Sequence, residues 1–236
     1  MKKIAIVSAM ERESAYTLEY LYKKDEWTRT FENTYQNQKL GIEVVVRVLG
    51  VGKVNAAYQT ADLIHDIHPM LIINVGVAGG MISGTDRGAV AIGTDYVQVD
   101  IRPYLEENLP YIEDTPDWIV EGIKEIAEEH GFSYECGRIA TGDFFLHSDE
   151  KKKEIIHEFA PVAFDMESAA IAQVATAKEI AFESIRIFSD LADADAVKYA
   201  GRADITGQEE LAIRKKLDRY PVILAIDFLT RYYDRI

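Results

Sequence analysis

Cysteine is almost absent from this chain of 236 residues, and the one present, Cys136, has no partner for an internal disulfide. No Cys/His spacing typical of a zinc site occurs. A long apolar run is also missing, because Glu11, Arg12 and Glu13 interrupt the one that follows the N-terminal lysines, so we expect neither a signal peptide nor a membrane span. These features favour a protein of the reducing cytoplasm.

Positive charge is scarce. The chain carries 26 Lys and Arg residues against 40 Asp and Glu residues, which gives a net charge of −14 and a pI of about 4.8. A surface this acidic repels phosphate backbones and anionic lipids, so we expect neither nucleic acid nor a membrane as partner. Hydrophobic residues make up 48%, as in ordinary globular proteins. The length suits one large domain or two small ones.

Signals for strands and helices alternate along the chain. Apolar, β-branched runs predict strands at residues 4–7, 42–49, 71–75, 89–99, 137–140, 162–164 and 182–188. Helical spacing or composition predicts helices at residues 11–22, 53–67, 118–130, 155–159, 169–175 and from 208 onward, where Pro221 would start a new helix or kink one. Residues 28–38 suit a hairpin, and residues 101–117, with three prolines, suit a long loop. We therefore predict one α/β domain over residues 1–236, with a mixed, largely parallel twisted sheet flanked by helices.

Polar residues follow five of the predicted strands, at residues 10–13, 50–53, 76–80, 166–167 and 189–190. Three of these strand ends carry carboxylates, namely Glu13, Glu167 and Asp190. Enzymes with open α/β sheets build their sites at the carboxyl ends of strands. An acid in the first turn of a helix can equally serve only as a cap. The pattern therefore indicates a candidate site without proving one.

Familiar catalytic motifs are missing. Arg47 stands where a P-loop would need its first glycine, and Asn55 stands where a dinucleotide fingerprint would need its third. The chain has no nucleophile elbow and no HExxH helix. Covalent and metal catalysis therefore have no support, and acid/base chemistry by paired carboxylates remains.

Six motifs in order carry a family resemblance: IVSAMERE (6–13), GVGKVNAA (50–57), INVGVAGG (73–80), TGDFF (141–145), DMESAA (165–170) and RIFSD (186–190). With them the chain resembles the 5′-methylthioadenosine/S-adenosylhomocysteine nucleosidases of the purine nucleoside phosphorylase-like superfamily. The resemblance implies a nucleoside phosphorylase-like fold, a nucleoside substrate, no cofactor or metal, and a homodimer. The implied reaction is hydrolysis of the N-glycosidic bond between adenine and a 5′-thio-substituted ribose.

The resemblance also implies roles for individual residues. Asp190, oriented by Ser189, would protonate or hydrogen-bond N7 of the leaving adenine. Glu13 would activate the attacking water, and Glu167 would hold the ribose hydroxyls and favour a cationic sugar. The remaining matches place Met166 along the ribose, Phe145 on the base and the Leu146 backbone at the purine edge, with Arg186, Asp143 and Asp165 as supporting residues.

Two departures from the family pattern leave alternatives open. Val77 stands where these nucleosidases usually carry Ser or Thr, and residues 98–112 lack the usual His-Asp-rich segment. The preferred 5′-group and base are therefore in question, and a hydrolase of another 5′-modified purine nucleoside, such as a futalosine-type compound, stays open. A purine or uridine phosphorylase is disfavoured because Glu13 would repel phosphate, with Lys53 the one cation nearby. A non-catalytic nucleoside-binding protein would not need all three acids. We expect the acidic, Tyr-rich residues 101–112 to contribute to the dimer contact.

Overall fold

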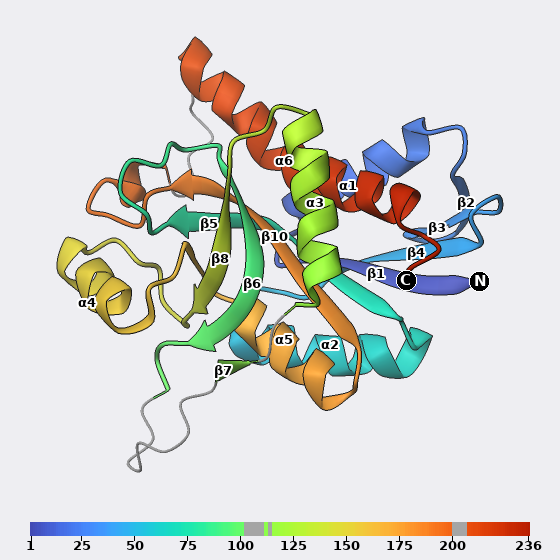
Figure 1. Ribbon diagram of the computed structural model, residues 1–236, viewed down its shortest axis with the longest axis horizontal. Coiled ribbons are helices and arrows are strands. Elements are labelled where there is room, and N and C mark those ends of the chain that lie inside the picture. The colour runs from blue at the N-terminus through green and yellow to red at the C-terminus, as the bar shows by residue number, and fades with distance from the viewer. Residues whose placement is uncertain (102–110, 113–114, 200–206) are drawn as a thin grey trace.

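Ten strands belong to one sheet in the computed structural model, which describes residues 1–101, 111–112, 115–199 and 207–236 (Figure 1). The strands are β1 (Lys2–Ser8), β2 (Thr28–Phe31), β3 (Thr34–Asn37), β4 (Ile42–Val48), β5 (Leu71–Gly80), β6 (Val90–Gln98), β7 (Tyr111–Ile112), β8 (Tyr134–Thr141), β9 (Ala163–Asp165) and β10 (Ala181–Asp190). The helices are α1 (Glu11–Lys23), α2 (Lys53–Ile67), α3 (Asp117–Glu129), α4 (Asp149–Phe159), α5 (Ser168–Ala177) and α6 (Gln208–Arg231), with a short 3₁₀ helix at Ala196–Lys198.

The middle of the sheet is parallel. Strands β4, β1, β5 and β10 lie side by side in one direction, and the hairpin β2–β3 extends the edge beyond β4. β10 then pairs antiparallel with β6, which continues through β8 to β9, and β9 pairs antiparallel with β5. This part of the sheet therefore closes on itself. The predicted α/β fold with a mixed, largely parallel sheet is confirmed.

Helices cover both faces of the sheet. α1, α3 and α6 pack on one face, whereas α2 and α5 pack on the other (Figure 1). In α3 the buried side chains Ile119, Ile123 and Ile126 recur at helical spacing, which explains why this segment forms a helix with one apolar face. Fully burying each such side chain contributes about 1.5–3 kcal/mol.

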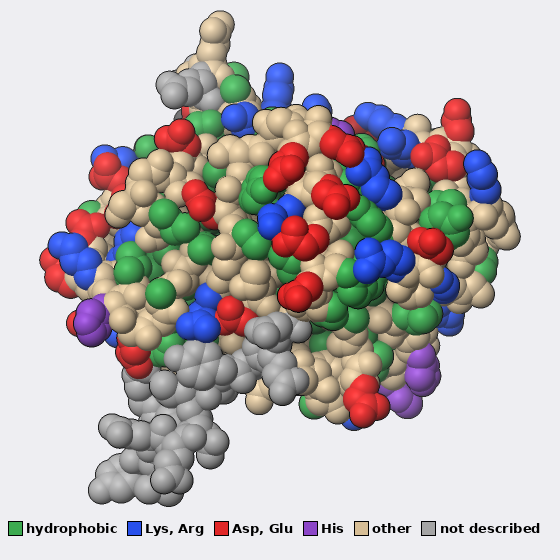
Figure 2. All heavy atoms as spheres, in the orientation of Figure 1, with side chains coloured by type: hydrophobic (Ala, Val, Ile, Leu, Met, Phe, Trp, Pro, Cys, Tyr) green, Lys and Arg blue, Asp and Glu red, His purple; other side chains and the backbone are tan. Residues whose placement is uncertain are grey.

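The outer surface is polar. On the face shown in Figure 2, acidic and basic side chains are interspersed among apolar ones. None of the helices in the described ranges is long and apolar enough to cross a membrane.

Strand β5 is longer than predicted. The sequence predicts that this strand ends at Val75. In the structure β5 continues to Gly80, pairing with β10 and, at its end, with β9. Glycines occur here because other groups approach closely. A Cβ on Gly79 would lie 2.8 Å from Cβ of Ala192, and one on Gly80 would lie 3.2 Å from the ring of Phe188. The glycine-rich stretch is thus a crowded strand rather than a tight turn.

For the C-terminal helix, one of the two predicted alternatives is ruled out. No new helix starts at Pro221, because α6 runs unbroken from Gln208 to Arg231 with the proline inside it. The proline ring removes one backbone donor. Burial of Val222, Leu224 and Phe228 just beyond it holds the second half of the helix in the core.

The predicted loop at residues 101–117 can be assessed only in part. Strand β7 pairs with Tyr96 and Val97 of β6, and α3 begins at Asp117, so these parts are not loop. Residues 102–110 and 113–114 lie outside the described residues, as does most of the segment expected to contribute to the dimer contact.

Candidate active site

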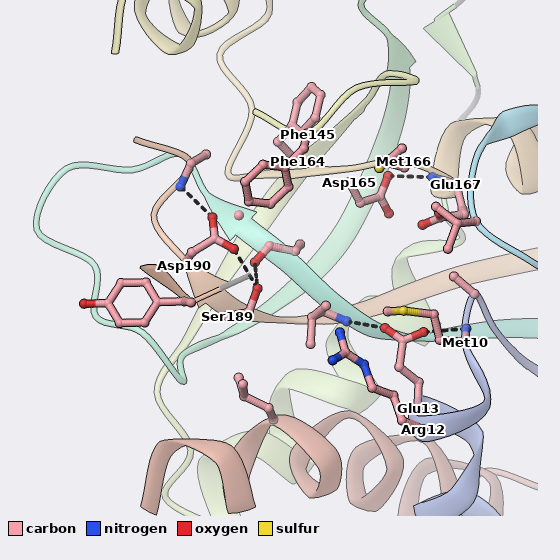
Figure 3. A pocket seen from close by; sticks show the side chains of 18 of the residues that line it. Met10, Arg12, Glu13, Phe145, Phe164, Asp165, Met166, Glu167, Ser189 and Asp190 are labelled. Carbon is pink, nitrogen blue, oxygen red and sulfur yellow. Dashed lines mark hydrogen bonds between the residues drawn. The ribbon is translucent and has the colours of Figure 1, made fainter. Parts of the chain in front are cut away.

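A pocket of about 490 Å³ opens at the carboxyl ends of β1, β5, β9 and β10 (Figure 3). This is the edge of the sheet at which the polar strand ends were expected to meet. Nine of the predicted site residues line it: Glu13, Val77, Phe145, Leu146, Asp165, Met166, Glu167, Ser189 and Asp190. The other two, Arg186 and Asp143, lie outside the lining.

Glu13 is buried in the first turn of α1, and both carboxylate oxygens accept backbone hydrogen bonds. Oε2 accepts from the N–H of Met10 at 2.9 Å, and Oε1 accepts from the N–H of Val77 at 3.1 Å. The first bond caps the helix, as the simple interpretation of a first-turn acid predicts. The second fixes the carboxylate against β5, facing the pocket.

Glu167 lies between β9 and α5 and is also buried. Oε1 accepts from the N–H of Gly52 at 3.0 Å, and Oε2 lies 3.2 Å from Nη2 of Arg186. Burial raises the pKa of Glu167 to about 7, the charge of Arg186 opposes this rise, and the nearby Asp165 carboxylate adds to it. Glu167 therefore changes charge near neutral pH.

Arg186 is fully buried behind the pocket. Nε and Nη2 both bind Oδ2 of Asp165, at 2.9 and 2.7 Å, and Nη2 also reaches Glu167. Nη1 has no hydrogen-bond partner among the described residues. A Cβ on Gly76 would collide with this Nη1 and would lie 2.7 Å from Oε1 of Glu13. Glycine at position 76 thus lets Arg186 and Glu13 approach the strand from the same side.

Asp165 and Asp143 organise the surroundings of the pocket. Buried Asp165 accepts hydrogen bonds from Thr141 Oγ1 at 2.6 Å and from Ser168, in addition to Arg186. Asp143 accepts from the N–H of Lys53 at 2.7 Å. Helix α2 has no acid in its own first turn. The backbone N–H groups of Gly52 and Lys53 at its N-terminus instead donate to Glu167 and Asp143 from elsewhere in the chain.

Asp190 ends β10 and lies across the pocket from Glu13 (Figure 3). Oδ1 accepts from the N–H of Ala192 at 2.9 Å, and Oδ2 accepts from Oγ of Ser189 at 2.8 Å. Burial raises the pKa of Asp190, and these two hydrogen bonds oppose the rise. The register of β10 shifts between Phe188 and Asp190, which allows two consecutive side chains to reach the same pocket.

Phe145, Leu146 and Met166 contribute to the apolar wall of the pocket, together with residues such as Met10, Val51 and Phe164. Phe145 is 43% exposed, and its ring lies nearly parallel to that of His147, 5.9 Å away. A large exposed ring in a pocket offers a surface on which a flat heterocycle can stack. Leu146 is buried and Met166 is partly buried.

Several lining residues were not predicted: Arg12, Arg87, Tyr199, Glu210, Arg214, Leu217 and Asp218. Arg87 donates from Nε to the carbonyl of Ser189 at 2.6 Å and binds Glu210 through two nitrogens, at 2.6 and 2.8 Å. Its guanidinium also lies 3.5 Å from the centre of the Tyr199 ring. No local sequence pattern marks these residues. Glu210, for example, reaches the pocket only through the packing of α6.

Known proteins resemble this chain over nearly its whole length. A family model described as the phosphorylase superfamily matches residues 3–217. A 5′-methylthioadenosine/S-adenosylhomocysteine nucleosidase of Haemophilus influenzae is 32% identical, covering 96% of this chain and all of that protein.

Solved structures agree. A nucleosidase of the same name from Neisseria meningitidis, in complex with methylthio-immucillin-A, is 29% identical with a TM-score of 0.79, covering 97% of this chain and 99% of that one. A futalosine hydrolase of Helicobacter pylori shares the fold, with 24% identity, a TM-score of 0.77 and coverage of 100% and 98%. From these matches, the chain belongs to the 5′-methylthioadenosine/S-adenosylhomocysteine nucleosidase family of the phosphorylase superfamily.

Proposed function

We propose that this protein hydrolyses the N-glycosidic bond of 5′-thio-substituted adenine nucleosides, releasing adenine and the thio-ribose. One observation carries the proposal: two buried carboxylates, Glu13 and Asp190, face the same pocket from different strand ends. The names of the relatives, which include 5′-methylthioadenosine and S-adenosylhomocysteine, give the substrate class.

Each acid suits one part of the reaction. Cleavage of the bond between C1′ and the base nitrogen develops positive charge on the ribosyl group and negative charge on adenine. Asp190, with its raised pKa, delivers a proton to N7 of the base. Glu13 takes a proton from the water that adds to C1′. Glu167 accepts hydrogen bonds from the ribose hydroxyls, and its charge stabilises the cationic sugar.

The surroundings of Gly76 support a role for Glu13 in water activation. Nη1 of Arg186 is a buried donor that no described residue satisfies, and it lies against the same glycine as Oε1 of Glu13. A buried guanidinium N–H needs a polar partner. We place the reacting water between this donor and Glu13, where Arg186 orients it and Glu13 removes its proton.

Hydrolysis fits the charges better than phosphorolysis. A phosphate dianion would need cations that outweigh the carboxylates of the pocket. Arg12 lies beside Glu13 without an ion pair in the described ranges, but the other nearby cations are already engaged. Lys53 is bound to Asp100 at 2.5 Å and to Gln98, and Arg87 is bound to Glu210. Arg186 is already shared between Asp165 and Glu167. Electrostatic repulsion therefore makes a phosphate dianion next to three carboxylates less favourable than a water molecule there.

We also propose that the protein acts as a homodimer in the cytoplasm and contributes to methionine salvage. Exposed apolar side chains support the dimer: Val54 is 76% exposed on α2, and Val51 and Tyr58 beside it are exposed as well. Val51 also lines the pocket, so a partner covering α2 would lie near the substrate. The single cysteine suits a reducing compartment.

The test is release of adenine from 5′-methylthioadenosine by the parent protein and by Asp190→Asn. We expect the parent to release adenine and the variant to be slower by at least ~10²-fold, the scale of a lost general acid, while still binding the nucleoside. Near-parental turnover in Asp190→Asn would remove Asp190 from the mechanism. Absence of adenine with the parent protein would refute the proposed activity.

A further inference from the structure

Lys152 of α4 donates to two backbone carbonyls beside the pocket, although it does not line the pocket itself. Its Nζ lies 3.0 Å from the carbonyl oxygen of Gly80, at the end of β5, and 2.5 Å from the carbonyl oxygen of Leu191. The side chain is partly buried. Lys152 therefore ties α4 both to the end of β5 and to the turn that follows β10.

The peptide group between Leu191 and Ala192 is held from both sides. Its carbonyl accepts from Lys152, and its N–H donates to Oδ1 of Asp190 at 2.9 Å. The C=O and N–H of a trans peptide lie in one plane and point in opposite directions. A bond that fixes the carbonyl therefore fixes the N–H as well. A cation on the carbonyl also polarises the peptide, which strengthens the hydrogen bond to Asp190.

The backbone of this turn is strained and needs such a hold. Ala192 has a φ of +50°, in the left-handed region that residues with a Cβ rarely adopt. Its Cβ packs so closely on β5 that a Cβ at Gly79 would lie only 2.8 Å from it. Rotation of the Leu191–Ala192 peptide would relieve the φ of Ala192, but it would also turn the N–H away from Asp190.

We propose that Lys152 is a positioning residue for Asp190 and acts through the Leu191–Ala192 peptide. This inference rests on the proposed function, in which Asp190 protonates the base. Asp190 faces the pocket with one oxygen held by Ala192 and the other by Ser189, so these two bonds set the orientation of its carboxyl group (Figure 3). Loss of the Lys152 bond would let this group turn away from the base without removing any side chain that touches the substrate.

The test measures kcat and KM for 5′-methylthioadenosine in Lys152→Met, which keeps an unbranched stem and removes the donors. We expect kcat to fall on the order of tenfold, the scale of a lost charge-assisted hydrogen bond, with a smaller change in KM. Lys152→Arg keeps the charge and the donors and should recover most of the loss. Lys153→Gln is the control, because Lys153 is the next residue of α4, is exposed and does not line the pocket. It should keep the parental kcat.

The same Lys152→Met substitution in an Asp190→Asn background separates positioning from a general loss of structure. Once the acid is absent, its orientation no longer affects the rate, so the residual kcat should change by less than about twofold. An equal tenfold fall in both backgrounds, or parental kcat in Lys152→Met, overturns the positioning role and leaves the nucleosidase activity standing. Failure of the parent to release adenine overturns the proposed function and the positioning role with it.

Discussion

The backbone N–H of Val77 donates to Oε1 of Glu13 at 3.1 Å, which joins the first turn of α1 to strand β5. In the sequence, Val77 is notable because it stands where the related nucleosidases usually carry the hydroxyl of Ser or Thr. In the structure its backbone holds the candidate base, while its side chain lines the pocket. The position of Glu13 therefore depends on the path of β5 and not on the side chain at position 77.

Glu13→Gln tests the candidate base with little change in shape. The amide oxygen can still accept from Val77, so the fold and nucleoside binding should be retained. An amide cannot take a proton from water, and we expect turnover to fall by at least ~10²-fold. Adenine release and nucleoside affinity measured on the same preparation check this. Hydrolysis at the parental rate would place water activation elsewhere.

Gly76→Ala tests the shared space beside β5. The new Cβ would collide with Nη1 of Arg186 and would lie 2.7 Å from Oε1 of Glu13. We expect turnover to fall by ~10²-fold or more and the protein to lose about 1–3 kcal/mol of stability, as overpacked cores do.

The control for this substitution is Gly207→Ala, where an added Cβ meets nothing within 4 Å. Turnover and the urea midpoint are compared for both variants. If Gly76→Ala retained parental turnover, the close approach of Arg186 and Glu13 at this glycine would have no part in catalysis.

The pKa of Glu167, raised to about 7 by burial, predicts a pH dependence. Below this pH the carboxylate gains a proton and loses its charge and acceptor capacity, so kcat/KM should fall as the pH decreases through about 7. In Glu167→Gln the residual kcat/KM should not show this decrease at lower pH. Exposed Glu150→Gln on α4 is the control and should keep it. If the decrease in kcat/KM at lower pH persisted in Glu167→Gln, it would have to be assigned to another group.

Glu183 predicts how stability responds to pH. It is fully buried on β10; Oε1 accepts from the N–H of Gly93 at 3.2 Å, and Oε2 has no partner among the described residues. Burial raises its pKa well above the ordinary value. From about pH 4.3, the unfolded value, upward to the folded pKa, the folded state binds more protons, so its stability decreases as the pH rises.

Glu183→Gln should remove this contribution, because an amide does not titrate. Urea unfolding at about pH 5 and about pH 8 should show a smaller loss of stability with pH in the variant than in the parent. Exposed Glu32→Gln should behave like the parent. Identical slopes in Glu183→Gln and the parent would mean that Glu183 is not held protonated in the folded state.

Most of the fold could be predicted because the central strands are continuous apolar runs. The acids were also predictable, since Glu13, Glu167 and Asp190 follow strands whose carboxyl ends meet. The extent of β5 was not, because glycine marks both tight turns and crowded strands, and only the positions of Ala192 and Phe188 decide between them.

The α6 side of the pocket could not be predicted either. Glu210, Arg214, Leu217 and Asp218 follow all the other lining residues along the chain, on a helix whose sequence gives no sign of a site. Their place depends on how α6 packs beside α1 on the sheet. From the sequence, Arg12 was interpreted only as one of the charges that interrupt an apolar run, and no role in the site was predicted for it.

The central claim, that water and not phosphate attacks the nucleoside, is tested most directly by analysing the products formed from 5′-methylthioadenosine with and without phosphate. The account predicts free adenine and free thio-ribose at the same rate in both conditions. A sugar 1-phosphate that formed only in the presence of phosphate would contradict it and would remove Glu13 from the role of base.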